Sequence, residues 1–180
     1  LTLAPASPPF LSSGHPRLDT TGSWIAFESV ANFTGQNSDF SSEIYRMRPD
    51  GTAKQQISAM ESFQRSWKPD ISGSGNLIVY SSTGNPFGTN PDHNGELFLW
   101  DASTGSTRQL TVTTDGVNED ARISEDGAWI YFISTAPIVE FDPDHPRDGY
   151  RIEVATGRIE RVVALRLSNP TVAGVLDPSD

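Results

Sequence analysis

Short runs of β-branched and aromatic residues, separated by polar turns, recur along this chain at a nearly constant distance. Three of these runs follow a glycine, and they begin 53 and then 52 residues apart. They read GSWIAFES from Gly22, GNLIVYSS from Gly75 and GAWIYFIS from Gly127. Runs of this composition and length are typical of β-strands. No segment shows the 3.6-residue spacing of apolar positions that an amphipathic helix requires.

The segments around each run repeat as well. A shorter strand ending in a turn precedes it, in RLDTTG, DISGSG and RISEDG. A polar loop and a third strand follow, in EIYRM, ELFLW and GYRIEV, and then a turn and a fourth strand, in KQQIS, TRQLT and RIERVV. Four antiparallel strands in a repeated unit of this length are typical of a propeller blade. The sequence therefore predicts an all-β protein, a β-propeller segment over residues 1–180 with three four-stranded antiparallel blades at about 15–58, 68–111 and 120–163.

These repeats resemble the TolB-type propeller repeat, a WD-repeat-like family. The resemblance rests on DISGSGNLIVYSS, GELFLWDASTGSTRQLT and ARISEDGAWIYFIS, and it covers roughly residues 15 to 163. It implies a periplasmic or secreted bacterial protein that acts through protein–protein contacts. The loops between the second and third strands are longer than is usual in the family, and Gly149 stands where the other units have Ile44 and Leu97.

Three blades are too few for a closed ring, since propellers usually have four to eight. The segment 169–180 resembles the first strand of a further blade, and the first residues resemble the last strand of a preceding one. Two arrangements are therefore expected. Two copies could form a homodimer that closes a six-bladed ring, or the chain could be joined to the remaining blades of a longer protein.

Composition excludes several classes of function. The chain has no cysteine, which excludes disulfides, thiol catalysis and cysteine-bound zinc. A formal net charge of −10 disfavours nucleic acid as a partner. No apolar run is long enough to span a membrane, and neither a G-x-S-x-G motif nor a glycine-rich phosphate loop is present.

The tripeptide Pro-Asp-His occurs twice, ending at His93 and at His145. Aligning the repeats groups Asp39, Asp92 and Asp144 at one position, with Asn and Glu or Asp residues nearby. Oxygen ligands at alternating positions suit Ca²⁺, so these three carboxylates are candidate calcium ligands. The competing interpretation is that the residues form turns and that the motif reflects duplication of the repeat. No other cofactor is expected.

The loops after the second and fourth strands are expected on one face, around the channel opening. Phe63, Arg65, Trp67 and Lys68 lie in the segment between the first two blades and combine aromatic rings with cations, as protein-binding hot spots do. The favoured hypothesis is a non-enzymatic scaffold that binds a protein or peptide there. The alternatives are a propeller enzyme or an accessory domain of a hydrolase or peptidase, and a fragment or assembled set of repeats without its own activity. A carboxylate cluster at the channel opening would favour the enzyme, whereas an apolar or mixed surface around Phe63 and Trp67 would favour the binder.

Overall fold

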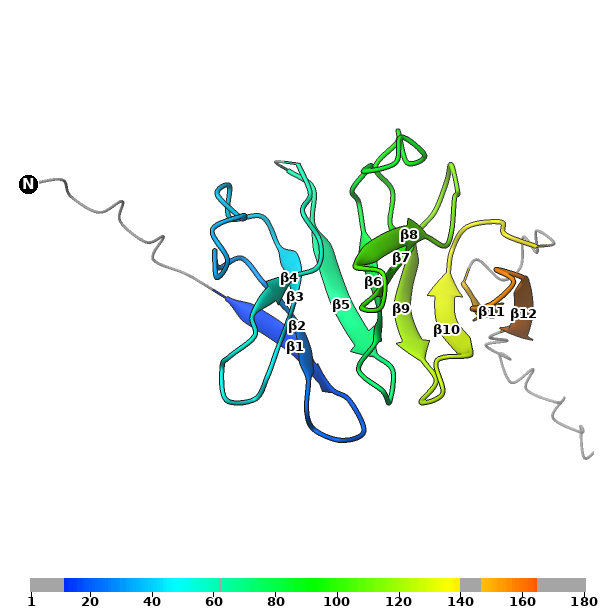
Figure 1. Cartoon of the computed structure of the whole chain (residues 1–180). Helices are drawn as coiled ribbons and strands as arrows, with labels where there is room; N and C mark the ends of the chain where they lie inside the picture. The colour runs from blue at the N-terminus through cyan, green and yellow to red at the C-terminus, as the bar shows by residue number, and fades with distance from the viewer. Residues whose placement is uncertain (1–11, 62, 140–146, 165–180) are drawn as a thin grey trace, which may run out of the picture.

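Three separate four-stranded antiparallel sheets make up the fold, as the repeat predicts (Figure 1). The computed structural model describes residues 12–61, 63–139 and 147–164. Within these residues all regular elements are strands, and there is no helix long and apolar enough to cross a membrane. The predicted strand at 169–180 lies outside the described residues. The three sheets do not close into a ring.

Each sheet is one blade, with its strands in chain order. Blade 1 consists of β1 (Ser13–Leu18), β2 (Ile25–Ser29), β3 (Glu43–Met47) and β4 (Gln55–Gln56). Blade 2 consists of β5 (Ser66–Ile71), β6 (Leu77–Ser82), β7 (Glu96–Asp101) and β8 (Ser106–Gln109). Blade 3 consists of β9 (Asn118–Ile123), β10 (Trp129–Ser134), β11 (Asp148–Glu153) and β12 (Ile159–Ala164).

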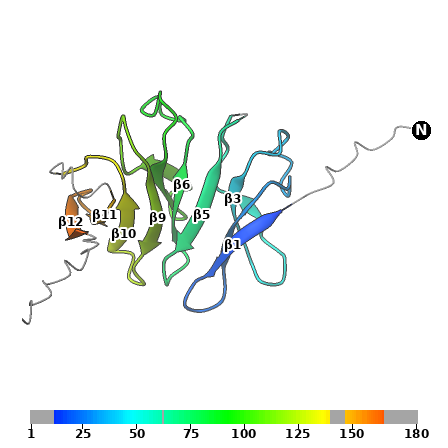
Figure 2. The same cartoon turned by 180° about the vertical axis from the view of Figure 1, so that it is seen from behind.

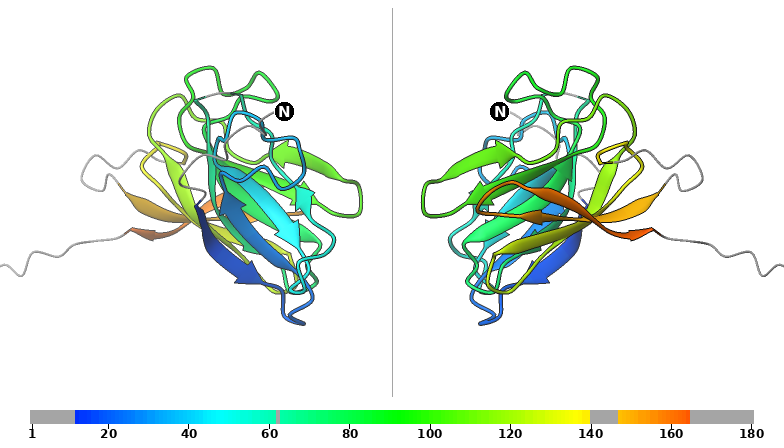
Figure 3. Two further views of the ribbon diagram at one scale, coloured as in Figure 1. Left: turned by 90° about the vertical axis from the view of Figure 1, so that its left-hand side faces the viewer. Right: turned by 90° about the vertical axis from the view of Figure 1, so that its right-hand side faces the viewer.

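The first strands β1, β5 and β9 lie side by side, with β5 in the middle (Figure 2). They form the inner edge of the blades, and the outer strands turn away from them through the strong twist of each sheet (Figure 3). The long loops and the links between blades lie on one face, and the tight hairpins lie on the opposite face (Figure 1). We call these the loop face and the hairpin face.

The hairpin after each first strand explains the repeated glycines. Gly22, Gly75 and Gly127 have φ angles of 68°, 73° and 74°, a region that glycine enters without steric cost. The side chain of the residue that opens each turn accepts a hydrogen bond from the backbone nitrogen five residues further along the chain. Asp19 accepts from Trp24, Ser72 from Leu77 and Ser124 from Trp129, at 3.2, 3.1 and 3.0 Å.

Each first strand begins two residues before the blade start that the sequence predicts, at 13, 66 and 118 rather than 15, 68 and 120. The strand pattern is hidden there because the pairing of the first with the second strand shifts register in all three blades. On the first strands the shifts lie between Gly14 and Arg17, between Trp67 and Asp70, and between Glu119 and Arg122. A β-bulge of this kind breaks the alternation of side chains and tolerates proline, here Pro16 and Pro69.

The hydrophobic core lies between blades. Ala26, Ile44 and Ile57 of blade 1 pack against blade 2, in a cluster with Ile71, Ile78, Tyr80, Phe98 and Trp100. Alternate residues of the same blade 2 strands, Val79, Leu97 and Leu99, pack against blade 3. Both faces of blade 2 are therefore buried, which explains why its strands read as the nearly continuous apolar runs LIVY and LFLW.

One arginine lies inside the interface between blades 1 and 2. Arg46, 8% exposed, has its guanidinium 3.9 Å from the ring centre of Trp24 and 4.6 Å from that of Trp100. Its Nη1 donates to the backbone oxygen of Gly75 at 2.9 Å, and burial lowers the pKa of the group. A planar cation stacked between two indoles joins the two blades.

We expect Arg46→Lys to lower the free energy of unfolding by about 1–3 kcal/mol, because an ammonium can neither stack as a plane nor keep the same hydrogen bonds. Urea unfolding followed by tryptophan fluorescence measures the change. The matched control is Arg48→Lys, since Arg48 is exposed and lies 5.0 Å from the same Trp24 ring. Equal losses in the two variants would contradict the proposed role of the stack.

Candidate functional site

The long loops of the loop face are fixed by buried asparagines at equivalent repeat positions. Asn37 and Asn90 are 2% and 0% exposed. The Nδ2 of Asn37 donates to the backbone oxygens of Val30 and Ser41, and the Nδ2 of Asn90 donates to those of Gly84 and Asn94. The loops are therefore held from inside, and what they display is positioned by the blades.

The Pro-Asp-His motif forms a turn at its first occurrence. His93 has a φ of 53°, and Phe40, at the same position of the previous unit, has a φ of 58°. The backbone nitrogen of His93 donates to the oxygen of Asn90 at 3.3 Å. A shared left-handed turn favours the interpretation that the motif reflects duplication of the repeat. The second motif, with Asp144 and His145, lies outside the described residues.

The described calcium candidates lie in separate loops. Asp39 and Asp92 are both exposed, and Asp39 accepts hydrogen bonds from the backbone and hydroxyl of Ser41 at 3.3 and 3.0 Å. Across residues 12–61, 63–139 and 147–164 there is no group of three or more His, Asp or Glu side chains arranged to hold a metal. Calcium binding by Asp39, Asp92 and Asp144 stays a prediction.

The acidic residues at the start of each third strand have a different role. Glu43 and Glu96 are 1% and 0% exposed. Glu43 accepts from the hydroxyls of Ser58 and Ser41 and, at 2.7 Å, from the backbone of Met60. Glu96 accepts from the backbone of Thr113 at 2.6 Å. Burial raises the pKa of Glu43 although these hydrogen bonds oppose the shift. These carboxylates anchor the links between blades.

The four residues predicted to bind a ligand lie in two different settings, the link and the strand β5. Phe63 is fully exposed on the link before β5. Arg65 follows two positions later, with its guanidinium 5.0 Å from the ring centre of Trp67. Trp67 and Lys68 belong to β5 rather than to the link, because the bulged strand begins at Ser66. Lys68 is turned into a charged network along the inner strands.

This network is centred on the bulges and was not anticipated from the sequence. His15, Lys68 and Asp120 are the bulge residues of β1, β5 and β9, and their φ angles are 49°, 50° and 57°. Positive φ is uncommon for residues other than glycine, although Asp and His adopt it more readily than most. One ionisable residue in each unit, 53 and 52 positions apart, was the signal in the sequence.

The bulge residues are connected across the blades. Lys68 Nζ contacts Asp120 Oδ1 at 2.7 Å, and the backbone nitrogen of Lys68 donates to Glu28 Oε2 at 2.6 Å. His15 Nδ1 lies 3.0 Å from Glu28 Oε1. Arg147 adds contacts of 3.3 Å to Asp120 and 3.2 Å to Glu119. The hydrogen bond to Asp120 raises the pKa of Lys68, and the bond from Lys68 lowers the pKa of Asp120.

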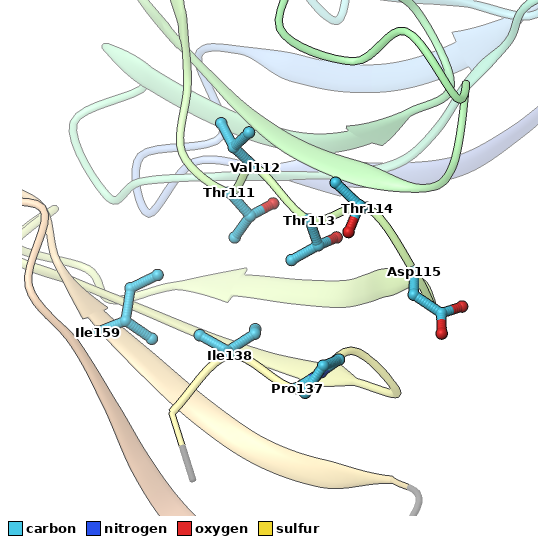
Figure 4. A pocket seen from close by; sticks show the side chains of 8 residues that line it. All are labelled: Thr111, Val112, Thr113, Thr114, Asp115, Pro137, Ile138 and Ile159. Atoms are coloured by element: carbon cyan, nitrogen blue, oxygen red, sulfur yellow. The ribbon is translucent and has the colours of Figure 1, made fainter. Parts of the chain in front are cut away.

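Two grooves open on the loop face where a link meets the next blade's loop. One, of about 280 Å³, lies between Ala59–Gln64 and the loop of blade 2. Gln64 spans it, with Nε2 3.3 Å from His93 Nδ1. The other, of about 370 Å³, lies between residues 111–115 and the loop of blade 3 (Figure 4). Its lining mixes threonines with Val112, Pro137, Ile138 and Ile159.

Most of the exposed large apolar side chains lie on the loop face. Of the ten large apolar side chains that are exposed among the described residues, seven lie in loops or links of the loop face. They are Phe33, Phe40, Phe63, Phe87, Val112, Val117 and Val139. Large exposed apolar patches mark interaction sites on soluble proteins, whereas single exposed apolar residues are common. The surface around Phe63 is thus mixed apolar and polar.

Comparison with solved structures confirms the fold. TolB of Agrobacterium tumefaciens superposes with a TM-score of 0.59 at 21% identity, over 81% of this chain and 44% of that one. TolB of Acinetobacter baumannii superposes with a TM-score of 0.53 at 19% identity, over 84% of this chain and 32% of that one. The β-propeller domain of the trilobed protease from Pyrococcus furiosus superposes with a TM-score of 0.57 at 15% identity, over 86% of this chain and 43% of that one.

The chain thus has the fold of TolB-like β-propeller domains and spans less than half the length of these three structures. No protein-family model matches the sequence, and no curated protein matches it. The resemblance seen in the repeats is therefore confirmed for the architecture, as a partial propeller.

We expect Asp120→Asn to lower the free energy of unfolding by about 0.5–1 kcal/mol at neutral pH, because it removes the charge that Lys68 and Arg147 contact. Asparagine keeps both the size of the side chain and the tolerance for positive φ. Since the folded protein lowers the pKa of Asp120, this stabilisation is present above the ordinary carboxyl pKa of about 3.9 and is lost as pH falls through the lower folded value.

Urea unfolding at a series of pH values measures this difference. The control is Asp92→Asn, which removes the same charge from an exposed turn. A difference between wild type and Asp120→Asn that stays constant into the acid range would show that the ion pair is not its cause.

Proposed function

We propose that this chain is a non-enzymatic propeller scaffold that binds a protein or peptide through its loop face. The observation that carries the proposal is Phe63, whose side chain is fully exposed while its backbone has a φ of 74°. A left-handed conformation costs a bulky residue roughly 1–2 kcal/mol. No burial of the ring within the described chain offsets that cost, whereas burial against a partner would.

The surroundings of Phe63 support the same proposal. Phe87, 50% exposed, stands on the neighbouring loop of blade 2, and the 280 Å³ groove lies between that loop and the link of Phe63. The stack of Arg65 on Trp67 adds a cation and an indole close by. Aromatic residues and arginine are the residue types that dominate protein-binding hot spots.

The loop face is also rigidly supported. The hydrogen bond from the backbone nitrogen of Met60 to Glu43 fixes the link, and the hydrogen bond from Asn90 to the backbone of Gly84 fixes the loop opposite. A surface held in one conformation before binding loses little entropy on association, which favours affinity.

A second candidate is an accessory propeller domain of a hydrolase or peptidase. It is favoured by the partial propeller, which spans 43% of the propeller domain of the Pyrococcus protease. In that case the same loop face would receive another domain instead of a separate protein. For either candidate function we propose the periplasmic or secreted location that the resemblance implies.

The test is selection of phage-displayed peptides on the wild-type protein, followed by affinity measurements on Phe63→Ser. We expect the selected peptides to lose affinity by about tenfold or more, as is usual for an aromatic hot spot. The matched control is Leu18→Ser, which removes a 60%-exposed apolar side chain at the hairpin-face end of β1. Peptides that bind both variants as tightly as wild type, or no enrichment at all, would contradict the proposal.

A further inference from the structure

The outer flank of blade 3 faces away from blade 2. Its residues occupy the same repeat positions as residues that are buried between blades 1 and 2 and between blades 2 and 3. Ala26 of blade 1 and Val79 of blade 2 are fully buried, whereas Tyr131 at the same repeat position is 44% exposed. Ile57 is 9% exposed, and Val162 at its equivalent position is 47% exposed. The flank is therefore a blade interface without its neighbouring blade in the described chain.

The arginine stack of the first interface recurs here in incomplete form. Trp129 and Arg151 occupy the repeat positions of Trp24 and Arg46. The Arg151 guanidinium lies 4.4 Å from the Trp129 ring centre, and its Nε donates to Glu160 at 2.8 Å. Arg46 also contacts two groups of the next blade, the ring of Trp100 and the backbone oxygen of Gly75. On Arg151, 37% of the side chain is exposed.

The completed interface defines the chemistry of the missing partner. It is a blade face with a large apolar side chain at the position of Trp100 and a hairpin glycine at the position of Gly75. A stacked aromatic pair also marks such a face, as Tyr80–Phe98 does in blade 2 and Phe132–Tyr150 in blade 3, with centroids 5.7 and 5.5 Å apart.

Blade 1 carries these features on its own outer flank. Phe27 and Tyr45 form the equivalent stacked pair, with centroids 5.8 Å apart, and Phe33 from the adjacent loop packs edge-on against both rings. Met47 stands at the position of Trp100 and is half-buried, and Gly22 stands at the position of Gly75. The two outer flanks of the chain thus carry the repeat positions of the two sides of its own blade interface, although Phe27 and Tyr45, 6% and 1% exposed, are already covered by Phe33.

We propose that the partner of the blade 3 flank is the blade 1 flank of a second copy of this chain, so that two copies close a six-bladed ring about a twofold axis. Met47 of the second copy would pack over Arg151, and the carbonyl of its Gly22 would accept a hydrogen bond from the guanidinium. Twofold dimers are the commonest homo-oligomers, and six blades fall within the range of closed propellers. This interface is separate from the loop face.

Sedimentation velocity tests the proposal on the wild-type chain and on two flank variants. Wild type is expected to sediment as a dimer of twice the 19.6 kDa chain mass. Tyr131→Glu and Val162→Glu, each of which places a charge in the interface, are expected to weaken association about tenfold or more. The control is Val112→Glu on the loop face, where a valine that is 64% exposed, against 47% for Val162, is changed and the dimer is expected to persist.

A mixing experiment tests the pairing of unlike flanks. Met47→Glu alone is expected to be monomeric, as is Tyr131→Glu alone. Each is expected to keep the β-sheet circular dichroism spectrum of wild type but to unfold at a lower midpoint, because association stabilises the folded chain. An equimolar mixture is expected to form a heterodimer, because one of its two interfaces then has both flanks unmodified. A monomeric wild type, or a dimer that Met47→Glu leaves unchanged, would overturn the proposal; the first result would assign the flank to another blade.

Discussion

The face-to-face packing of blades is the constraint on which the rest of this structure depends. Blade 2 buries both faces, with Val79 toward blade 3 and Ile78 toward blade 1. The two main hydrophobic clusters therefore lie between sheets, whereas Phe27 and Tyr45 of blade 1 are buried beneath Phe33 of their own blade. Because a single blade cannot bury its own faces, the stability of each unit depends on its neighbours, as in other repeat proteins.

This dependence explains why the fold could be predicted from the sequence. Turn chemistry and strand composition recur at a constant interval, and Gly22, Gly75 and Gly127 mark the same hairpin three times. The starts of the first strands could not be predicted in the same way. A bulge at His15, Lys68 and Asp120 breaks the alternation of apolar and polar residues, so the strand looked shorter than it is.

The candidate site was predictable only in part. Its place in the link between two predicted blades, beside another aromatic residue and two cations, marked Phe63 as a candidate for binding, and it is fully exposed. Its neighbour Lys68 looked equivalent in sequence but pairs with Asp120, 52 positions away, a contact that depends on two blades lying side by side. Glu43 follows a loop of candidate calcium ligands but is itself buried, where it accepts hydrogen bonds from Ser58 and Met60 of the link after the fourth strand. Local pattern predicts turns, whereas pairings across blades require the assembled fold.

The buried asparagines have a consequence for how such loops can change. Asn85 Oδ1 accepts from the backbone nitrogen of Asn90 at 2.7 Å, and Asn90 in turn bonds the backbone on either side of the loop. The four residues between these two asparagines therefore form a loop tip whose two ends are held in place. We expect substitutions within residues 86–89 to leave the strands in register, so that the loop can acquire new specificity without changes to the blade.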